Sequence, residues 1–333
     1  MSDIQRMLVL QNAMTQKSKD LFVKTLGSGS FATVYGPFSK IQTLSLLQKM
    51  FQNDDTYWKS VRHIINNLLV SSHTYIFRFE NLHFGKFTDA VSFNTETTNI
   101  IRHIPIRARP YFITPLMIGF SRSEIFEVQR YGGQELSKIL FKSSKSFWTP
   151  SRLRQSLISW YHLFEGCLVI LEKKDKMFTD IKPRNMVIDD TGNISIIDIE
   201  RISVPRKVNQ RIVFTINESL VPIQFINQVN FFDRVDEYRR KYLDKRTNHH
   251  QKKRDKEIIQ NFPVFDTPEK IKTMCRFTLT WTFMHLLHNV LEKTDHRLAS
   301  SFYNKHLQRL YTQRLTFDTY AFMKQIRVCI DRF

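Results

Sequence analysis

The chain has 333 residues, of which 42% are apolar and 13% aromatic, so it can bury a core and is not a disordered tail. Its 50 Lys and Arg against 31 Asp and Glu give a net charge of +19, so we expect a folded, basic protein long enough for two lobes. Three widely separated cysteines, Cys167, Cys275 and Cys329, exclude a disulfide scaffold and a zinc module. No apolar run approaches the roughly 18 residues of a membrane span. The first 20 residues lack a continuous signal-peptide core, so we expect a reducing intracellular compartment.

The first part of the chain is predicted to be rich in strands. The strands are expected within residues 21–35, on both sides of a glycine turn, and over residues 74–79, 111–120 and 124–131. Residues 41–70 have helical periodicity on either side of a turn at residues 53–55. A further helix is expected over residues 93–103.

The second part is predicted to be mostly helical. Thr149 and Pro150 are a typical cap and first position for a helix over residues 151–173. Two β-prone runs within residues 186–198 predict a hairpin with a glycine-containing turn. Helical periodicity returns over residues 267–331.

Four polar residues surround this hairpin. Asp180, Lys182 and Asn185 lie just before it, and Asp198 ends its second strand. A loop carboxylate can accept a proton from a substrate hydroxyl, and a lysine can neutralise a transferring phosphoryl group. An amide and a second carboxylate can hold Mg²⁺. The pattern indicates phosphoryl transfer; the alternative is a polar loop that caps a helix and begins a hairpin.

This arrangement resembles the eukaryotic-type protein kinase family, whose members carry H-R-D-x-K-P-x-N and then D-F-G. Residues 178–185 read F-T-D-I-K-P-R-N, and D-I-E begins at Asp198. The resemblance implies that Asp180 and Lys182 are catalytic and that Asn185 and Asp198 hold Mg²⁺. The Lys-Pro pair is similar to the serine/threonine subclass. The sequence departs from the family where Phe-Thr replaces His-Arg and Ile-Glu replaces Phe-Gly.

Residues 27–34, G-S-G-S-F-A-T-V, resemble the kinase glycine-rich loop G-x-G-x-x-G-x-V, with Ala32 in place of the third glycine. The resemblance implies that this loop covers the phosphates of ATP and that Val34 lies against the adenine ring. The implied nucleotide-binding residues are Gly27, Ser28, Gly29, Ser30, Phe31, Ala32 and Val34. A plain hairpin turn would also use glycines here.

The family also carries a lysine on the third strand, paired with a glutamate on the following helix. Counting along residues 74–79 puts Arg78 at the lysine position, and Glu96 is the candidate for the helix glutamate. Because a guanidinium is a planar fork and not a point charge, this exchange is not conservative. The other candidates for the phosphate-anchoring cation are Lys24, Lys40 and Lys86. Alternatively, Arg78 and Glu96 are ordinary surface charges.

The resemblance implies an α+β, bilobal, protein-kinase-like fold. Its small β-rich N-lobe would span residues 1–133, with a helical insertion at about 41–72, and its larger α-helical C-lobe residues 134–333. Gly132 and Gly133 would give the crossover its flexibility. We expect an ATP- and Mg²⁺-dependent serine/threonine kinase with a protein substrate. The departures leave two alternatives, a pseudokinase that acts as a binding or scaffold module and a kinase of small molecules or lipids.

Residues 239–256 hold nine Lys and Arg against two Asp. Such a run indicates binding of nucleic acid, an acidic partner or an acidic substrate, or else a solvated charged segment. Together with the loss of family motifs after residue 200, it is similar to the divergent kinases of large DNA viruses. That resemblance implies action in a host cell or a virion.

Overall fold

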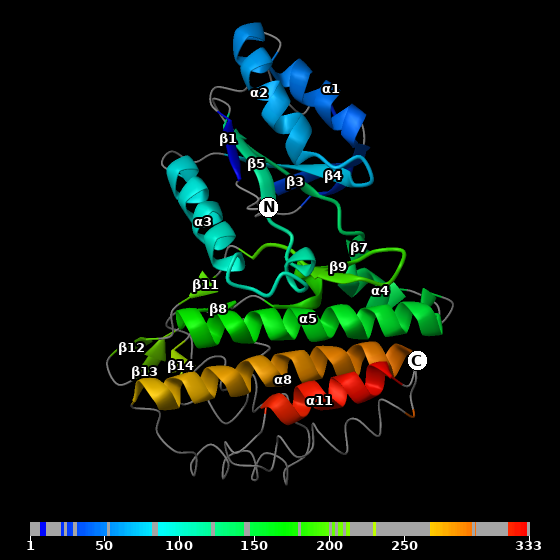
Figure 1. Ribbon diagram of the computed structural model, residues 1–333, viewed down its shortest axis with the longest axis vertical. Coiled ribbons are helices and arrows are strands. Elements are labelled where there is room, and N and C mark those ends of the chain that lie inside the picture. The colour runs from blue at the N-terminus through cyan, green and yellow to red at the C-terminus, as the bar shows by residue number, and fades with distance from the viewer. Residues whose placement is uncertain are drawn as a thin grey trace. The chain divides into compact units, whose positions relative to one another are not determined.

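The structure is a computed structural model that describes residues 7–10, 21–22, 25–28, 32–51, 54–81, 86–120, 124–142, 147–178, 181–199, 202–203, 206–208, 211–213, 229–230, 267–294, 297 and 319–331. It is a mixed α+β structure (Figure 1). The chain divides into unit 1, residues 1–102 and 113–132, and unit 2, residues 103–112 and 133–333. In the described ranges, no helix is both long enough and apolar enough to cross a membrane.

Unit 1 is built on a six-stranded sheet with the strand order β1-β5-β6-β4-β3-β2. The strands are β1 (Leu8–Leu10), β2 (Thr25–Ser28), β3 (Ala32–Ser39), β4 (Thr74–Asn81), β5 (Pro115–Phe120) and β6 (Glu124–Arg130). Neighbouring strands are antiparallel except β1, which is parallel to β5. Strand β1 is short and pairs with a distant segment, and it was not predicted from the sequence.

The two faces of this sheet differ in chemistry. Along β4, Tyr75, Phe77 and Phe79 are at most 2% exposed, whereas the residues between them are partly exposed. The ring of Phe22 lies 4.9 Å from that of Phe77 and 5.0 Å from that of Tyr35, measured between centroids. This aromatic face is therefore the core of unit 1, because side chains alternate across a strand.

Two helices connect β3 to β4 and complete this core. They are α1 (Lys40–Met50) and α2 (Asp55–Leu68), at the top of Figure 1. They bury Leu47, Trp58 and Ile65 with the aromatic side chains. Asp54 caps α2 by accepting a hydrogen bond from the Tyr57 amide at 2.9 Å. The predicted pair of helices is thus observed between the second and third strands of the antiparallel series.

Helix α3 (Lys86–Ile101) begins seven residues before the predicted start. Asp89 lies in its first turn, where a negative charge is stabilised by the helix dipole. Its buried polar residues are Asn94, Thr97 and Thr98. Asn94 reaches Glu127 of β6, so this part of α3 packs against the sheet face opposite Phe126 and Val128.

Unit 2 contains three helices that lie side by side, α5 (Pro150–Lys174), α8 (Pro268–Thr294) and α11 (Thr319–Ile330) (Figure 1). The predicted cap of α5 is observed, since the Thr149 side chain accepts a hydrogen bond from the Arg152 amide. The Phe164 ring lies 5.0 Å from that of Phe283 and 5.2 Å from that of Phe322. Aromatic packing therefore joins all three helices.

The remaining elements of unit 2 are short. They are η2 (Arg109–Tyr111), β7 (Gln134–Glu135), α4 (Leu136–Lys142), β8 (Met177–Phe178), η4 (Pro183–Asn185), β9 (Met186–Ile188), β10 (Ile194–Ile196), β11 (Ile202–Ser203), β12 (Arg206–Val208), β13 (Arg211–Val213) and β14 (Val229–Asn230). Strand β9 lies between β10 and β7 in a three-stranded sheet.

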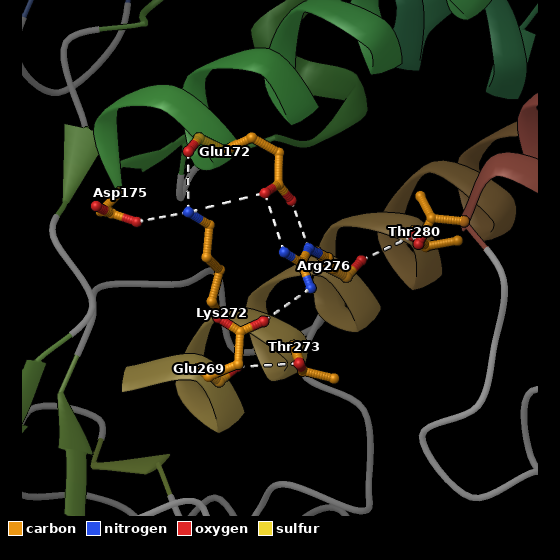
Figure 2. Close-up of polar contacts among 8 residues, drawn as sticks. Glu172, Asp175, Glu269, Lys272, Thr273, Arg276 and Thr280 are labelled. Carbon is orange, nitrogen blue, oxygen red and sulfur yellow. Dashed lines mark hydrogen bonds and ion pairs between the residues drawn. The ribbon is translucent and has the colours of Figure 1, made fainter. Parts of the chain in front are cut away.

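An ion cluster joins the end of α5 to the start of α8 (Figure 2). Arg276 contacts both carboxylate oxygens of Glu172, and its other terminal nitrogen lies 3.5 Å from Glu269. Lys272 donates to the Glu172 carbonyl at 2.9 Å and to the Asp175 carboxylate at 2.8 Å. The pKa of Glu172 lies below its ordinary value, mainly because Arg276 donates hydrogen bonds to the carboxylate.

The segment 103–112 belongs to unit 2, although it precedes two strands of unit 1 in the sequence. Arg107 forms an ion pair with Glu165 of α5, and Phe112 forms a parallel bridge with Ile196 of β10. A Cβ at Gly166 would lie 2.7 Å from the Phe112 ring, so glycine permits this approach. This segment was predicted to be part of an N-lobe spanning residues 1–133.

Candidate functional site

The β9–β10 hairpin brings two of the predicted site residues to the same end. Met186 pairs with Ile196 in the antiparallel register. One step further, the Ile197 amide donates a 2.8 Å hydrogen bond to the Asn185 carbonyl. Asn185 precedes β9 and Asp198 follows Ile197, so both residues lie at the open end of the hairpin.

Each of these residues has a constrained position. Asn185 is 7% exposed. Its backbone amide donates a hydrogen bond to the Lys182 carbonyl at 2.9 Å, which closes the short helix η4. Asp198 has φ +53°, in the left-handed region that residues other than glycine rarely adopt. Strained backbones of this kind concentrate at functional sites. Amide and carboxylate oxygens are the ligands that Mg²⁺ prefers, so the donor types at this end fit that ion.

The other end of the hairpin is a closed turn. The Asp189 carboxylate accepts hydrogen bonds from the amides of Thr191 and Asn193, at 3.0 and 2.8 Å. Gly192 has φ +97°, and a Cβ there would lie 2.4 Å from the Arg152 carbonyl oxygen. The turn therefore requires glycine both for its backbone conformation and for its contact with α5.

One face of α5 holds this turn by hydrogen bonds. The bonds run from Arg152 Nε to the Asp190 carbonyl (2.8 Å), from Gln155 Nε2 to Asn193 Oδ1 (2.6 Å), from Ser156 Oγ to the Gly192 carbonyl (2.7 Å) and from the Ile194 amide to Ser159 Oγ (2.9 Å). The four α5 residues are spaced at i, i+3, i+4 and i+7, so they share one helix face. The hairpin that carries Asn185 and Asp198 is thus built onto a rigid element.

Gly133 supports the hairpin from its other side. It has φ +109°, and a Cβ there would lie 2.0 Å from the Ile188 carbonyl oxygen. Gln134, the next residue, pairs with Ile188 of β9. The close approach of β7 to β9 therefore requires glycine at position 133, a role beyond the predicted flexibility.

In unit 1, the predicted nucleotide residues that the structure describes lie on β2, β3 and β4. Gly27 is paired with Val34, and Val34 with Arg78. Ala32 is paired with Glu80, two residues beyond Arg78. Directly paired residues share a sheet face, so Val34 and Arg78 lie together on the face opposite the aromatic core. The backbone of Ser28 continues β2.

Arg78 is the centre of a polar cluster on this face. Its Nη1 lies 3.3 Å from Glu127 Oε2, and its Nη2 lies 2.5 Å from Glu80 Oε1. The Asn94 amide of α3 donates to Glu127 Oε1 at 2.9 Å. Glu96, the predicted helix partner, is an exposed residue of α3.

Sequence reasoning missed Glu127, Glu80 and Asn94. A carboxylate between the apolar residues Phe126 and Val128 of β6 was a usable signal for Glu127, since it pairs directly with Arg78. Opposite charges at directly paired positions stabilise antiparallel strands. That signal needed the register between segments 49 residues apart.

Several predicted residues lie outside the described residues. They are Lys24, Gly29, Ser30, Phe31, Asp180 and the basic run 239–256. Of the other candidate cations, Lys40 donates to the Asn66 carbonyl at the end of α2, at 2.8 Å, and Lys86 is the first residue of α3.

Two of the cysteines, Cys167 and Cys275, are buried in the described part of the chain. Burial raises the pKa of the Cys275 thiol to about 12, and burial also raises that of Cys167. A thiol is nucleophilic as the thiolate, so neither cysteine is poised to react. Among the described residues, no three His, Cys, Asp or Glu side chains form a group that could hold a metal ion.

The chain was also compared with known proteins. It matches no model of a known protein family, and no curated protein matches its sequence.

Proposed function

We propose that this chain is an ATP- and Mg²⁺-dependent serine/threonine protein kinase with a bilobal kinase-like fold. The observation that carries the proposal is the hairpin end that joins Asn185 and Asp198, with Lys182 in the turn before it. These residues are the described part of the pattern D-x-K-P-x-N…D, on which the resemblance to protein kinases rests. Their oxygen donors are of the type that holds Mg²⁺.

In the proposed mechanism, the residues of unit 2 carry the chemistry. Asp180 orients the substrate hydroxyl and accepts its proton, and Lys182 offsets the negative charge on the transferring phosphoryl group. Asn185 and Asp198 hold Mg²⁺, which neutralises charge on the phosphates when it is bound. Because α5 fixes the turn of the hairpin, Asn185 and Asp198 need little rearrangement before the reaction.

The residues of unit 1 bind the nucleotide in this proposal. The glycine-rich segment 27–32 covers the phosphates, Val34 contacts the adenine ring, and Arg78 is the phosphate-anchoring cation. The order of elements supports this assignment. From β2 to β6, the chain forms two strands joined by a glycine-containing connection, then the helices α1 and α2, then a third strand with a cation, a helix and a strand pair. The resemblance implies the same order.

A pseudokinase of the same fold is the second candidate. The observation that favours it is the engagement of Arg78 by two carboxylates, Glu80 and Glu127, which oppose the binding of a phosphate to the same guanidinium. A kinase of small molecules or lipids would use the same residues on a different acceptor.

The test is phosphotransfer from ATP labelled at the γ-phosphate, with Mg²⁺ and with a basic and an acidic protein as acceptors. We expect label on protein, and its loss in Asp180→Ala and Asp198→Asn. Asp190→Asn is the matched control, because Asp190 is an exposed residue of the same hairpin. Undiminished labelling in Asp180→Ala would exclude the mechanism. Absence of labelling in the natural chain would favour the pseudokinase, and label on small molecules or lipids alone would favour the third alternative.

A further inference from the structure

Two carboxylates share Arg78, and they differ in burial. The side chain of Glu127 is 6% exposed and that of Glu80 is 31% exposed. Arg78 itself is 14% exposed. A buried carboxylate is costly to leave without partners, whereas a partly exposed carboxylate such as Glu80 can exchange a protein partner for water at a lower cost. The two ion pairs are therefore unequal, although both use terminal nitrogens of one guanidinium.

Glu127 is held from two directions. Arg78 of β4 lies at its Oε2, and Asn94 of α3 donates to its Oε1. Because a carboxylate only accepts hydrogen bonds, the contact fixes the Asn94 amide with its nitrogen toward Glu127. The Asn94 amide oxygen is buried and has no hydrogen-bond partner among the described residues. This orientation leaves Asn94 Oδ1 without a hydrogen bond from the described residues, so the described hydrogen bond of the Asn94 side chain is the one to Glu127.

Glu80 lies on the phosphate side of Arg78 in the proposed site. It is paired across the sheet with Ala32, the last residue of the segment that the proposal places over the phosphates. It follows Arg78 by two positions, so both side chains leave the same face of β4. Its carboxylate occupies one amino group of the guanidinium, which a phosphate oxygen would also use.

The charges in this cluster also favour replacement of Glu80 by a phosphate at Arg78. One guanidinium faces two carboxylates. Each carboxylate repels a phosphate that approaches Arg78 while both carboxylates stay in place. If the more exposed Glu80 leaves Arg78, the guanidinium and the buried Glu127 balance each other.

We propose that Glu127 is a positioning residue for Arg78 and that Glu80 competes with the ATP phosphates for the same guanidinium. An arginine suits this arrangement because its planar guanidinium can keep Glu127 at Nη1 while Nη2 exchanges Glu80 for a phosphate. Asn94 joins α3 to the cluster through its hydrogen bond to Glu127. The inference rests on the proposed function, since it assigns Arg78 to phosphate binding.

The test compares the KM for ATP and the kcat of Glu80→Gln and Glu127→Gln at a fixed Mg²⁺ concentration. Glu80→Gln removes the competitor, so the KM should fall by up to about fivefold, a ratio that corresponds to a partly exposed ion pair. Glu127→Gln removes the positioning group, so the KM should rise. A purely structural role for both residues would not lower the KM in either variant.

Glu172→Gln is the matched control. Glu172 also pairs with an arginine and is also 31% exposed, but it lies in the ion cluster of α5 and α8. The KM of Glu172→Gln for ATP should equal that of the natural chain. If Glu127→Gln does not fold, as judged by circular dichroism, Glu80→Gln decides alone.

An unchanged or raised KM in Glu80→Gln would overturn the inference while the proposed function stands. If the natural chain binds no ATP in a calorimetric titration, both the inference and the proposed function are wrong. The two failures are therefore distinguishable by the behaviour of the natural chain.

Discussion

Ser159 links α5 to the hairpin that carries the candidate Mg²⁺ residues. Its side chain is fully buried. The Ser159 hydroxyl accepts a hydrogen bond from the Ile194 backbone amide at 2.9 Å and donates one to the Ser156 carbonyl at 2.9 Å. Ser159→Ala removes the acceptor and leaves a buried amide without a partner. An unsatisfied buried donor costs about 1–3 kcal/mol, so the free energy of unfolding should fall by that amount.

The measurement is urea unfolding of the whole chain together with hydrogen exchange of residues 186–198, where protection of the Ile194 amide should be lost. Ser60→Ala is the control, since the Ser60 hydroxyl also donates to a helix carbonyl but is exposed. Its free energy of unfolding should stay within about 0.5 kcal/mol of the natural chain. If the two variants are equally stable and the Ile194 amide stays protected, this hydrogen bond does not hold the hairpin.

Two other features of unit 2 give testable expectations for stability. Gly192→Ala should destabilise unit 2 by at least about 1–2 kcal/mol in urea unfolding, because an alanine is strained at φ +97° and its Cβ overlaps the Arg152 carbonyl. Gly27→Ala is the control, because no atom of the described residues lies within 4 Å of the new Cβ. Equal effects of the two substitutions would contradict the account of the turn. The pKa of Glu172 is lowered from 4.5 by Arg276, so the stability that this carboxylate contributes is present above that value and is lost as the pH falls through the lower folded-state pKa. Below about pH 4.5, the free energy of unfolding should therefore decline less steeply with falling pH in Glu172→Gln than in the natural chain. An identical decline in the two proteins would exclude Glu172 as a source of acid sensitivity.

Local signals were sufficient for much of unit 2. Thr149 followed by Pro150 predicted the start of α5, since capping and the fixed φ of proline act within one helical turn. The glycine turn between β9 and β10 was also predicted from neighbouring residues, because Asp189 and Gly192 close it among themselves. Helices and tight turns depend on groups a few residues apart, and the sequence displays those groups together.

The polar cluster of unit 1 was not predictable in this way. Arg78 was identified as the candidate cation, and its pairing with Glu96 of the following helix stays a prediction. The structure gives Arg78 contacts to Glu127 of β6 and Glu80 of its own strand. Glu127 became a partner because the strand order places β6 beside β4, with β5 on the outer side.

The sequence by itself determined the mixed α+β character, the helix α5 with its cap, the hairpin and the spacing of Lys182, Asn185 and Asp198. Tertiary structure alone decided that β1 pairs with β5, that segment 103–112 joins unit 2, and that Arg78 contacts Glu127. The physical reason is the range of the interactions. Backbone caps and turns are set by neighbours in the chain, whereas strand register and ion pairs between distant segments form only when the whole sheet is assembled.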